Sequence, residues 1–395
     1  MTADQAGGRI AAAVPVAAGR DARLDLFRGL AMFIILVAHV PGNWLTLWIP
    51  ARFGFSDATE IFVFCSGMAS AIAFGRVFDR AGWTMGTARV ALRVWQVYWA
   101  HIGLFFAIAA IVVAADGIGF STRSYVRQLN LMPFFNRPME QLPALMTLRY
   151  VPNYFDILPM YLVILAMMPV VMALARVNLW LVAGFVGTVW LAANMGRLSL
   201  PAEPWSQRAW FFNPFGWQLV FFTGFAFMRG WLPRPPVTAA LVALAAGIVL
   251  VTVPFAYFRI LNAVPELREA MQSIRLLTTK TDFGILRYVH FLALAYLAWA
   301  AAGAGGRRLR PEGEGLGARA MRAIVPVIET VGQQSLAVFI VSMAAARVMG
   351  MALDVLGRSG LTMLLVNGAG FALLIAVAYG VGWFKSEPWR ARRAG

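Results

Sequence analysis

The chain has 395 residues, of which 60% are hydrophobic and only 13% are charged. Soluble domains are about half apolar and about a quarter charged, so this composition excludes an ordinary soluble protein and indicates a polytopic membrane protein. The formal net charge of +16 does not indicate a nucleic-acid partner, because the arginines stand in small groups between apolar runs and form no basic helix face. Such groups mainly set membrane orientation.

Ten apolar runs approach the roughly 20 residues that a transmembrane helix needs. We therefore predict an all-α transmembrane helix bundle of about ten spans over residues 23–385. A disordered cytoplasmic tail, rather than a cleaved signal peptide, is expected over residues 1–22, and a basic cytoplasmic tail over residues 386–395. The predicted spans are residues 25–43, 58–75, 92–115, 155–175, 177–194, 214–230, 237–258, 283–303, 323–346 and 361–384.

The arginine distribution predicts the orientation. Most of the 34 Lys and Arg residues fall in segments that lie in the cytoplasm if the N-terminus is cytoplasmic, and cytoplasmic loops carry such an excess. Both termini are therefore predicted to be cytoplasmic. The connections over residues 116–154, 195–213 and 259–282 would then face outward, and the Gly- and Arg-rich linker over 304–322 would face inward.

The first apolar run, "RLDLFRGLAMFIILVAHVPGNW" over residues 23–44, carries Asp25, Arg28 and His39. A helix turns about 100° per residue, so these three side chains lie along one stripe, with His39 about 16 Å beyond Arg28. Ionisable groups inside a membrane are costly and are candidates for function. The alternatives are purely structural roles: an ion pair between Asp25 and Arg28 at the helix entrance and an interhelical hydrogen bond of His39.

The stretch "FSDATEIFVFCSG" opens the second predicted span and carries two acids on one face, Asp57 and Glu60. This span begins on the outer side, so both acids lie at a depth similar to that of His39. A carboxylate that accepts a ring N–H fixes the imidazole tautomer and strengthens the other nitrogen as a base. Asp57 is equally consistent with the N-cap of the helix.

Two further pairs share a helix face: Arg89 with Arg93 at the inner start of the third span, and Arg287 with His290 in the eighth. The first pair is consistent with binding of an anionic ligand or with positive-inside anchoring. The sequence contains no phosphate-binding loop, nucleophile elbow or zinc-protease motif and no Cys/His metal spacing, so we expect no metal.

Several motifs resemble those of known membrane acyltransferases. "RLDLFRGLAMFIILVAH", "EIFVFCSG", "RVALRVWQVY" and "VGQQSLAVFI" are similar to motifs of the acyltransferase-3 superfamily, the last with Phe339 where the superfamily has Tyr. A closer resemblance, over residues 22 to 384, is to the OpgC family, which is associated with succinylation of osmoregulated periplasmic glucans. It rests on "DLFRGLAMFIILVAHVPGN", "FGFSDATEIFVFCSG", "VPNYFDILPMYLV" and "RYVHFLALAYL" in that order.

The resemblance implies a multi-pass O-acyltransferase of the bacterial inner membrane, embedded in membrane lipid. It implies cytoplasmic acyl-CoA as co-substrate, carrying succinyl or another short acyl group, a periplasmic glucan or other glycan as acceptor, and no bound cofactor. His39 is then the expected general base, oriented by Glu60 or Asp57, and an acyl-histidine intermediate stays open. Arg28, Arg89 and Arg93 are expected to bind acyl-CoA. The expected acceptor-binding or supporting residues are Asp25, Asn153, Tyr154, Asp156, Arg287, His290 and Ser335.

The alternative function is that of a secondary transporter or exporter of a small polar solute, which would also need buried ionisable side chains. Many transporters are built from internal repeats. The lack of a clear internal repeat and the bunching of ionisable groups in the first three spans favour the enzyme.

Overall fold

The computed structural model describes residues 21–119 and 122–389, and the fold of this part is all-helical, as predicted. It contains no strand, only an isolated bridge between Pro201 and Ala209. The expected N-terminal tail, apart from its last two residues, and residues 390–395 of the expected C-terminal tail lie outside the described residues.

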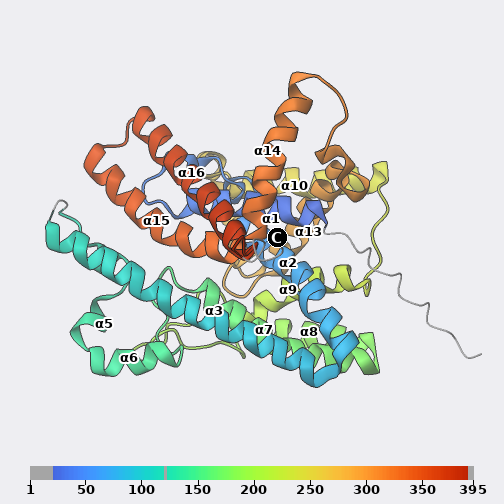
Figure 1. The fold of residues 1–395 in the computed structure, drawn as a ribbon, viewed down its shortest axis with the longest axis horizontal. Coiled ribbons are helices and arrows are strands. Elements are labelled where there is room, and N and C mark those ends of the chain that lie inside the picture. Colours follow the sequence, from blue (N-terminus) through green and yellow to red (C-terminus); the bar gives the residue numbers. More distant parts are fainter. Residues whose placement is uncertain (1–20, 120–121, 390–395) are drawn as a thin grey trace, which may run out of the picture.

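Figure 1 shows long helices running through the centre of the molecule and short helices, such as α5 and α6, at its periphery. A π-helix, η3, joins α2 to α3, and four 3-10 helices lie in the connections of the described chain. In chain order the elements are α1 (Ala22–His39), η1 (Trp44–Leu47), η2 (Pro50–Arg52), α2 (Ala58–Ser70), η3 (Ala71–Gly75), α3 (Arg76–Ile118), α4 (Tyr125–Gln128), α5 (Met132–Asn136), α6 (Pro138–Met146), α7 (Ile157–Val177), α8 (Leu179–Asn194), α9 (Pro214–Arg229), α10 (Ala239–Ala256), α11 (Phe258–Ala263), α12 (Pro265–Ser273), η4 (Arg275–Thr278), α13 (Ile285–Ala302), η5 (Ala304–Leu309), α14 (Leu316–Gln333), α15 (Ser335–Leu356) and α16 (Gly360–Lys385).

Six helical segments of the described chain are long and apolar enough to cross a membrane by length and composition. Helices α1, α8 and α9 coincide with predicted spans but fall outside this set, because α1 carries three charged residues and α8 and α9 each have only 16 residues. About ten spans and cytoplasmic termini therefore stay predictions. The six segments are Ala58–Ile118, Ile157–Val177, Ala239–Ala256, Ile285–Ala302, Ser335–Leu356 and Gly360–Lys385.

Two predicted boundaries differ from the structure. The predicted span 323–346 is wrong, because the helix is interrupted at Gln334, between α14 and α15. The polar residues of "GQQS" interrupt an apolar run that is long enough for one helix. The second and third predicted spans belong to nearly continuous helix, which bends at Gly82, where φ is 82°. This positive φ favours glycine because it has no Cβ to clash.

The bundle has two ends that organise the polar residues. Arg23 at the start of α1 donates to the carbonyl of Gly303, just after α13, at 3.2 Å, so the two helices run in opposite directions. We call this the Arg23 end, and it is the end predicted to face the cytoplasm. The opposite end, which we call the His39 end, contains the end of α1 and the starts of α2, α7 and α13.

Helices α2 and α9 pack backbone against backbone. A Cβ on Gly67 would lie 1.9 Å from the carbonyl oxygen of Phe221, and one on Gly224 would lie 2.3 Å from that of Phe64. Small residues permit such close approach between membrane helices, where van der Waals packing replaces the hydrophobic effect as the driving force. This contact fixes α2, and with it the polar first turn of α2 at the His39 end.

Candidate active site

His39 is the last residue of α1, and its ring is anchored locally. Nδ1 lies 2.7 Å from the carbonyl oxygen of Ile35, one helical turn earlier. A carbonyl can only accept, so Nδ1 carries the proton and Nε2 presents a lone pair. The imidazole therefore has the tautomer that a general base needs.

A cavity of about 550 Å³, with a largely apolar wall that carries several polar side chains, is lined by His39 at its end of the bundle. We call it the His39 cavity. Its wall combines cationic, anionic and amide side chains with several aromatic ones, which suits a polar molecule with flat faces such as a sugar. Its lining residues are Ile35, His39, Thr59, Asn153, Tyr154, Asp156, Ile157, Arg208, Ala209, Trp210, Phe211, Phe212, Lys280, Thr281, Phe339 and Met343.

Tyr154 has a strained backbone beside the His39 ring. Its φ is 88°, a region that side chains with a Cβ rarely adopt and that persists only where the surroundings enforce it. The hydroxyl donates to the carbonyl of Met343 at 2.7 Å, and the ring meets the His39 ring edge to face, with centroids 5.3 Å apart. Strain of this kind clusters at functional sites.

Arg347, on α15, contacts the same two residues. Its guanidinium carbon lies 3.9 Å from the centroid of the Tyr154 ring, a cation–π contact. Its Nη2 also donates to the carbonyl of His39 at 2.9 Å. Arg347 is not among the residues predicted for the site, because it is one of many arginines and lies 308 positions from His39.

The two acids at the start of α2 do not orient His39, which corrects the sequence-based expectation. Asp57 is the N-cap, and its side chain accepts from the N–H of Thr59 at 2.7 Å, while the Glu60 side chain accepts from the N–H of Asp57 at 2.8 Å. Within residues 21–119 and 122–389, neither carboxylate is hydrogen-bonded to the ring of His39. The N-cap interpretation of Asp57 is confirmed.

Each of these acids is instead neutralised by a basic residue from the region before and at the start of α13. Lys280 donates to Asp57, and Arg287 pairs with Glu60 at 2.5 Å. The Glu60 side chain is completely buried, so its charge depends on this partner. Lys280 is absent from the predicted set, yet it lines the His39 cavity while it is paired with Asp57.

His290 anchors the segment before α2 and lies outside the lining of the His39 cavity. Its Nδ1 lies 2.7 Å from the Oγ of Ser56 and 3.3 Å from the backbone nitrogen of the same residue. Arg287 and His290 therefore face one segment, residues 56–60, as their three-residue spacing predicts. Their contacts position the start of α2.

Asp156 precedes α7 and lies at the cavity wall with 6% of its surface exposed. Its carboxylate accepts from the N–H of Phe211 at 3.2 Å. Burial raises the pKa of this carboxyl to about 6, although the hydrogen bond and nearby Arg208 favour the charged form. Asn153, three positions before Asp156, is exposed and lines the same cavity.

Arg208 enters the cavity from the connection between α8 and α9 and is also absent from the predicted set. Its side chain pairs with Glu203 at 3.0 Å and donates to the carbonyl of Val151 at 2.9 Å. These contacts tie the connection to the segment that carries Asn153 and Tyr154. Nothing in the local sequence distinguishes Arg208 from the other arginines of the outer loops.

The three arginines predicted to bind acyl-CoA do not line the His39 cavity. Arg28 is hydrogen-bonded to Ser335 at the start of α15, so the structure brings together two predicted residues that are 307 positions apart. Asp25, one turn before Arg28, is buried with 3% of its surface exposed. On α3, Arg89 is exposed, and Arg93 donates to Gln96 at 3.3 Å.

Within the described part of the chain, no group of three or more His, Cys, Asp or Glu side chains is placed to hold a metal ion. The His39 cavity offers for chemistry an imidazole, a carboxyl, an amide and two cationic side chains. They can accept a proton, bind hydroxyl groups and stabilise negative charge.

These features define a helical membrane protein with a cavity at one end of its bundle whose wall carries an imidazole and several charged side chains. The family described as OpgC protein matches residues 20–386, and the chain belongs to this family. Membership suggests a membrane acyltransferase that acts on glucans. Neither the comparison with curated proteins nor the comparison with solved structures found a match.

Proposed function

We propose that this protein is an integral membrane O-acyltransferase of the bacterial inner membrane. It transfers succinyl or another short acyl group from cytoplasmic acyl-CoA to a hydroxyl group of a periplasmic glucan. The observation that carries this proposal is the His39 imidazole in the lining of a cavity that also carries charged and amide side chains, with Nδ1 bonded to the Ile35 carbonyl, which leaves Nε2 as the basic nitrogen.

In the proposed reaction, the sugar hydroxyl oxygen attacks the thioester carbonyl carbon while His39 Nε2 takes the hydroxyl proton. The tetrahedral intermediate then expels the thiolate, which receives the proton from the imidazolium, so that an ester and free CoA result. Lys280 and Arg208 supply positive charge near the cavity, where negative charge develops on the carbonyl oxygen. A transient acyl-histidine, formed by attack of Nε2 on the thioester, is the less favoured route.

The acceptor is proposed to enter the His39 cavity from the periplasm. Asn153 and Asp156 offer hydrogen-bonding groups to sugar hydroxyls. Flat faces for glucose rings are offered by Phe211 and Phe212. Tyr154 shapes the cavity beside the base and is itself fixed by Met343 and Arg347.

The donor is proposed to approach from the Arg23 end. Arg28 lies eleven residues before His39 on α1, which corresponds to about 16 Å along the helix. Arginines bind phosphate groups through charge-assisted hydrogen bonds, so Arg28, Arg89 and Arg93 are proposed to hold the CoA phosphates. The pantetheine arm would then carry the thioester along the bundle toward His39.

The test is transfer of labelled succinyl from succinyl-CoA to a linear β-glucan by the purified protein. General bases contribute about 10²- to 10⁴-fold, so His39→Gln should lower the rate at least about 100-fold. The matched control is His101→Gln, which removes an imidazole of α3 that lies outside the lining of the His39 cavity. An undiminished rate in folded His39→Gln protein would refute the assignment.

The transporter alternative is not favoured by the family membership. It predicts uptake of a polar solute into vesicles that contain no acyl-CoA. Uptake under these conditions, together with no acyl transfer to the glucan, would replace the enzyme by a transporter.

A further inference from the structure

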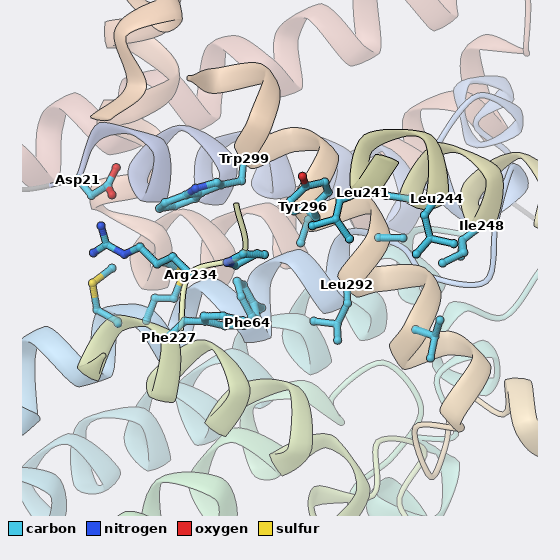
Figure 2. A pocket seen from close by; sticks show the side chains of 17 residues that line it. Asp21, Phe64, Phe227, Arg234, Leu241, Leu244, Ile248, Leu292, Tyr296 and Trp299 are labelled. Carbon is cyan, nitrogen blue, oxygen red and sulfur yellow. The ribbon is translucent and has the colours of Figure 1, made fainter. Parts of the chain in front are cut away.

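An apolar groove runs along the outside of the bundle between α9, α10 and α13, and its volume is about 390 Å³. We call it the α10 groove. Figure 2 shows aliphatic and aromatic side chains along it, with Asp21 and Arg234 at one end and Ile248 at the other. Leu241 and Ile248 are seven residues apart on α10, which corresponds to about 10 Å of groove.

The groove begins at the Arg23 end of the bundle. Trp299 lines it, and the ring of Trp299 lies 3.3 Å from the guanidinium carbon of Arg23. Leu244, on the wall of the groove, is 60% exposed. An exposed apolar wall along a membrane helix faces lipid chains, so the groove is open to the bilayer in the leaflet predicted to be cytoplasmic.

A second hollow, of about 330 Å³, adjoins the groove at this end. We call it the basic hollow. Its wall contains Arg76, Arg80 and Arg229 together with Asp79, which pairs with Arg229 at 2.6 Å. Met228 lines both the basic hollow and the α10 groove, so the two are neighbours.

The basic hollow coincides with a break in regular helix geometry. Residues Ala71–Gly75 form a π-helix between α2 and α3, and Ala71 and Ile72 line the hollow. Insertions of this kind occur often at functional sites. The π-helix leads directly into Arg76, and Arg80 follows one turn later.

We propose that these two neighbouring sites bind one anionic phospholipid of the cytoplasmic leaflet. An acyl chain lies in the α10 groove, and the phosphate lies between Arg234 and the arginines of the basic hollow. Basic pockets at the cytoplasmic side of membrane helices bind anionic headgroups, and the charge of the hollow complements such a headgroup. This site is separate from the His39 cavity and does not depend on the proposed acyl transfer.

The headgroup is tested by native mass spectrometry of the purified, delipidated protein in detergent, with added dioleoyl phosphatidylglycerol or dioleoyl phosphatidylcholine. The wild type should retain phosphatidylglycerol in preference. Each arginine near a membrane surface contributes about fivefold to such binding, so Arg76→Gln/Arg80→Gln should weaken it about 25-fold. The matched control, Arg307→Gln/Arg319→Gln, removes two exposed arginines outside both hollows and should leave binding unchanged.

The acyl-chain site is tested with Ala245→Trp, which places a large ring in the α10 groove, where Ala245 is 5% exposed. Retention of phosphatidylglycerol should be lost. Ala243→Trp adds the same ring to an exposed position of the same helix and should have no effect. Should Ala245→Trp fail to fold, the arginine pair decides the matter.

Three results would overturn the proposal. One is equal retention of the two lipids by the wild type, and another is unchanged binding in Arg76→Gln/Arg80→Gln. The third is displacement of phosphatidylglycerol by CoA, which would assign the basic hollow to the acyl donor.

Discussion

The buried pair of Glu60 and Arg287 gives the sharpest prediction, because the sequence and the structure assign different partners to Glu60. The sequence-based hypothesis couples Glu60 to His39, whereas the structure pairs it with Arg287 at 2.5 Å. The perturbation is therefore a double-mutant cycle with Glu60→Gln and Arg287→Met. Such a cycle isolates the energy of one pair.

The magnitude follows from the burial of the pair. The Glu60 side chain has no exposed surface and that of Arg287 is 12% exposed, so Arg287→Met leaves a buried carboxylate that still accepts from the Asp57 N–H but has lost its cation. Removal of one partner of a buried pair costs about 3–5 kcal/mol. In the Glu60→Gln background no charge is stranded, and the same substitution should cost about 1 kcal/mol. The coupling energy should therefore be about 2–4 kcal/mol.

The assay is equilibrium unfolding of the purified protein in mixed micelles, followed by circular dichroism. A second cycle, between Glu60→Gln and His39→Gln, serves as the comparison and should give less than about 0.5 kcal/mol, as expected for residues without a shared contact. A coupling near zero for Glu60 with Arg287, or a large one for Glu60 with His39, would refute the reasoning and restore the carboxylate as the orienting group.

Three further predictions concern stability. Burial raises the pKa of Asp156 to about 6, so the contribution of its carboxyl group to stability is present below about pH 4 and is lost as the pH rises through 6. Asp156→Asn should therefore remove a fall of about 2–3 kcal/mol in unfolding free energy between pH 4 and 7. Equal pH profiles of stability for the variant and the wild type would contradict this. Gly67→Leu should lower the unfolding free energy by about 3 kcal/mol or more, because the larger side chain separates α2 from α9. Gly184→Leu, where a Cβ meets open space, should lower it by almost nothing. Equal melting temperatures of the two variants would argue against the close contact. His101 is completely buried, and neither ring nitrogen has a hydrogen-bond partner in the described part of the chain. His101→Leu should therefore raise the unfolding free energy by about 1 kcal/mol or more. A destabilised variant would indicate that the imidazole has a hydrogen-bond partner.

Local sequence is sufficient to predict most helices and many residues at the His39 end. Apolar runs of the right length predict α7, α8, α9, α10, α13 and α16 to within a few residues. The 3.6-residue period correctly places Arg287 and His290 on one face, because that inference needs only the geometry of a single helix. The three-residue spacing of Asp57 and Glu60 is also the spacing of a capping box, which the structure shows.

Local sequence patterns do not predict which residues these side chains interact with. Lys280 and Arg287 lie 223 and 227 positions from their acidic partners, and such pairings are set by how whole helices pack. The sequence suggests a carboxylate as the group that orients His39, but a backbone carbonyl in the same helix does so. Every residue offers such a carbonyl, so sequence alone cannot distinguish this partner.

The break at Gln334 shows a different limit. A run of apolar residues on both sides of "GQQS" has the length and hydropathy of one span, and neither Gly nor Gln excludes a helix interior. What separates α14 from α15 is tertiary: α14 packs against α1, where a Cβ on Gly332 would lie 1.9 Å from the carbonyl oxygen of Asp25, and α15 then starts at Ser335 beside Arg28.

The most direct test of the central claim uses proteoliposomes with labelled succinyl-CoA on one side of the membrane and a β-glucan on the other. Label should appear on the glucan when donor and acceptor are on opposite sides, with the donor at the Arg23 end, and this label should be lost in His39→Gln. Transfer that requires both substrates on the same side, or that persists in folded His39→Gln protein, would contradict it.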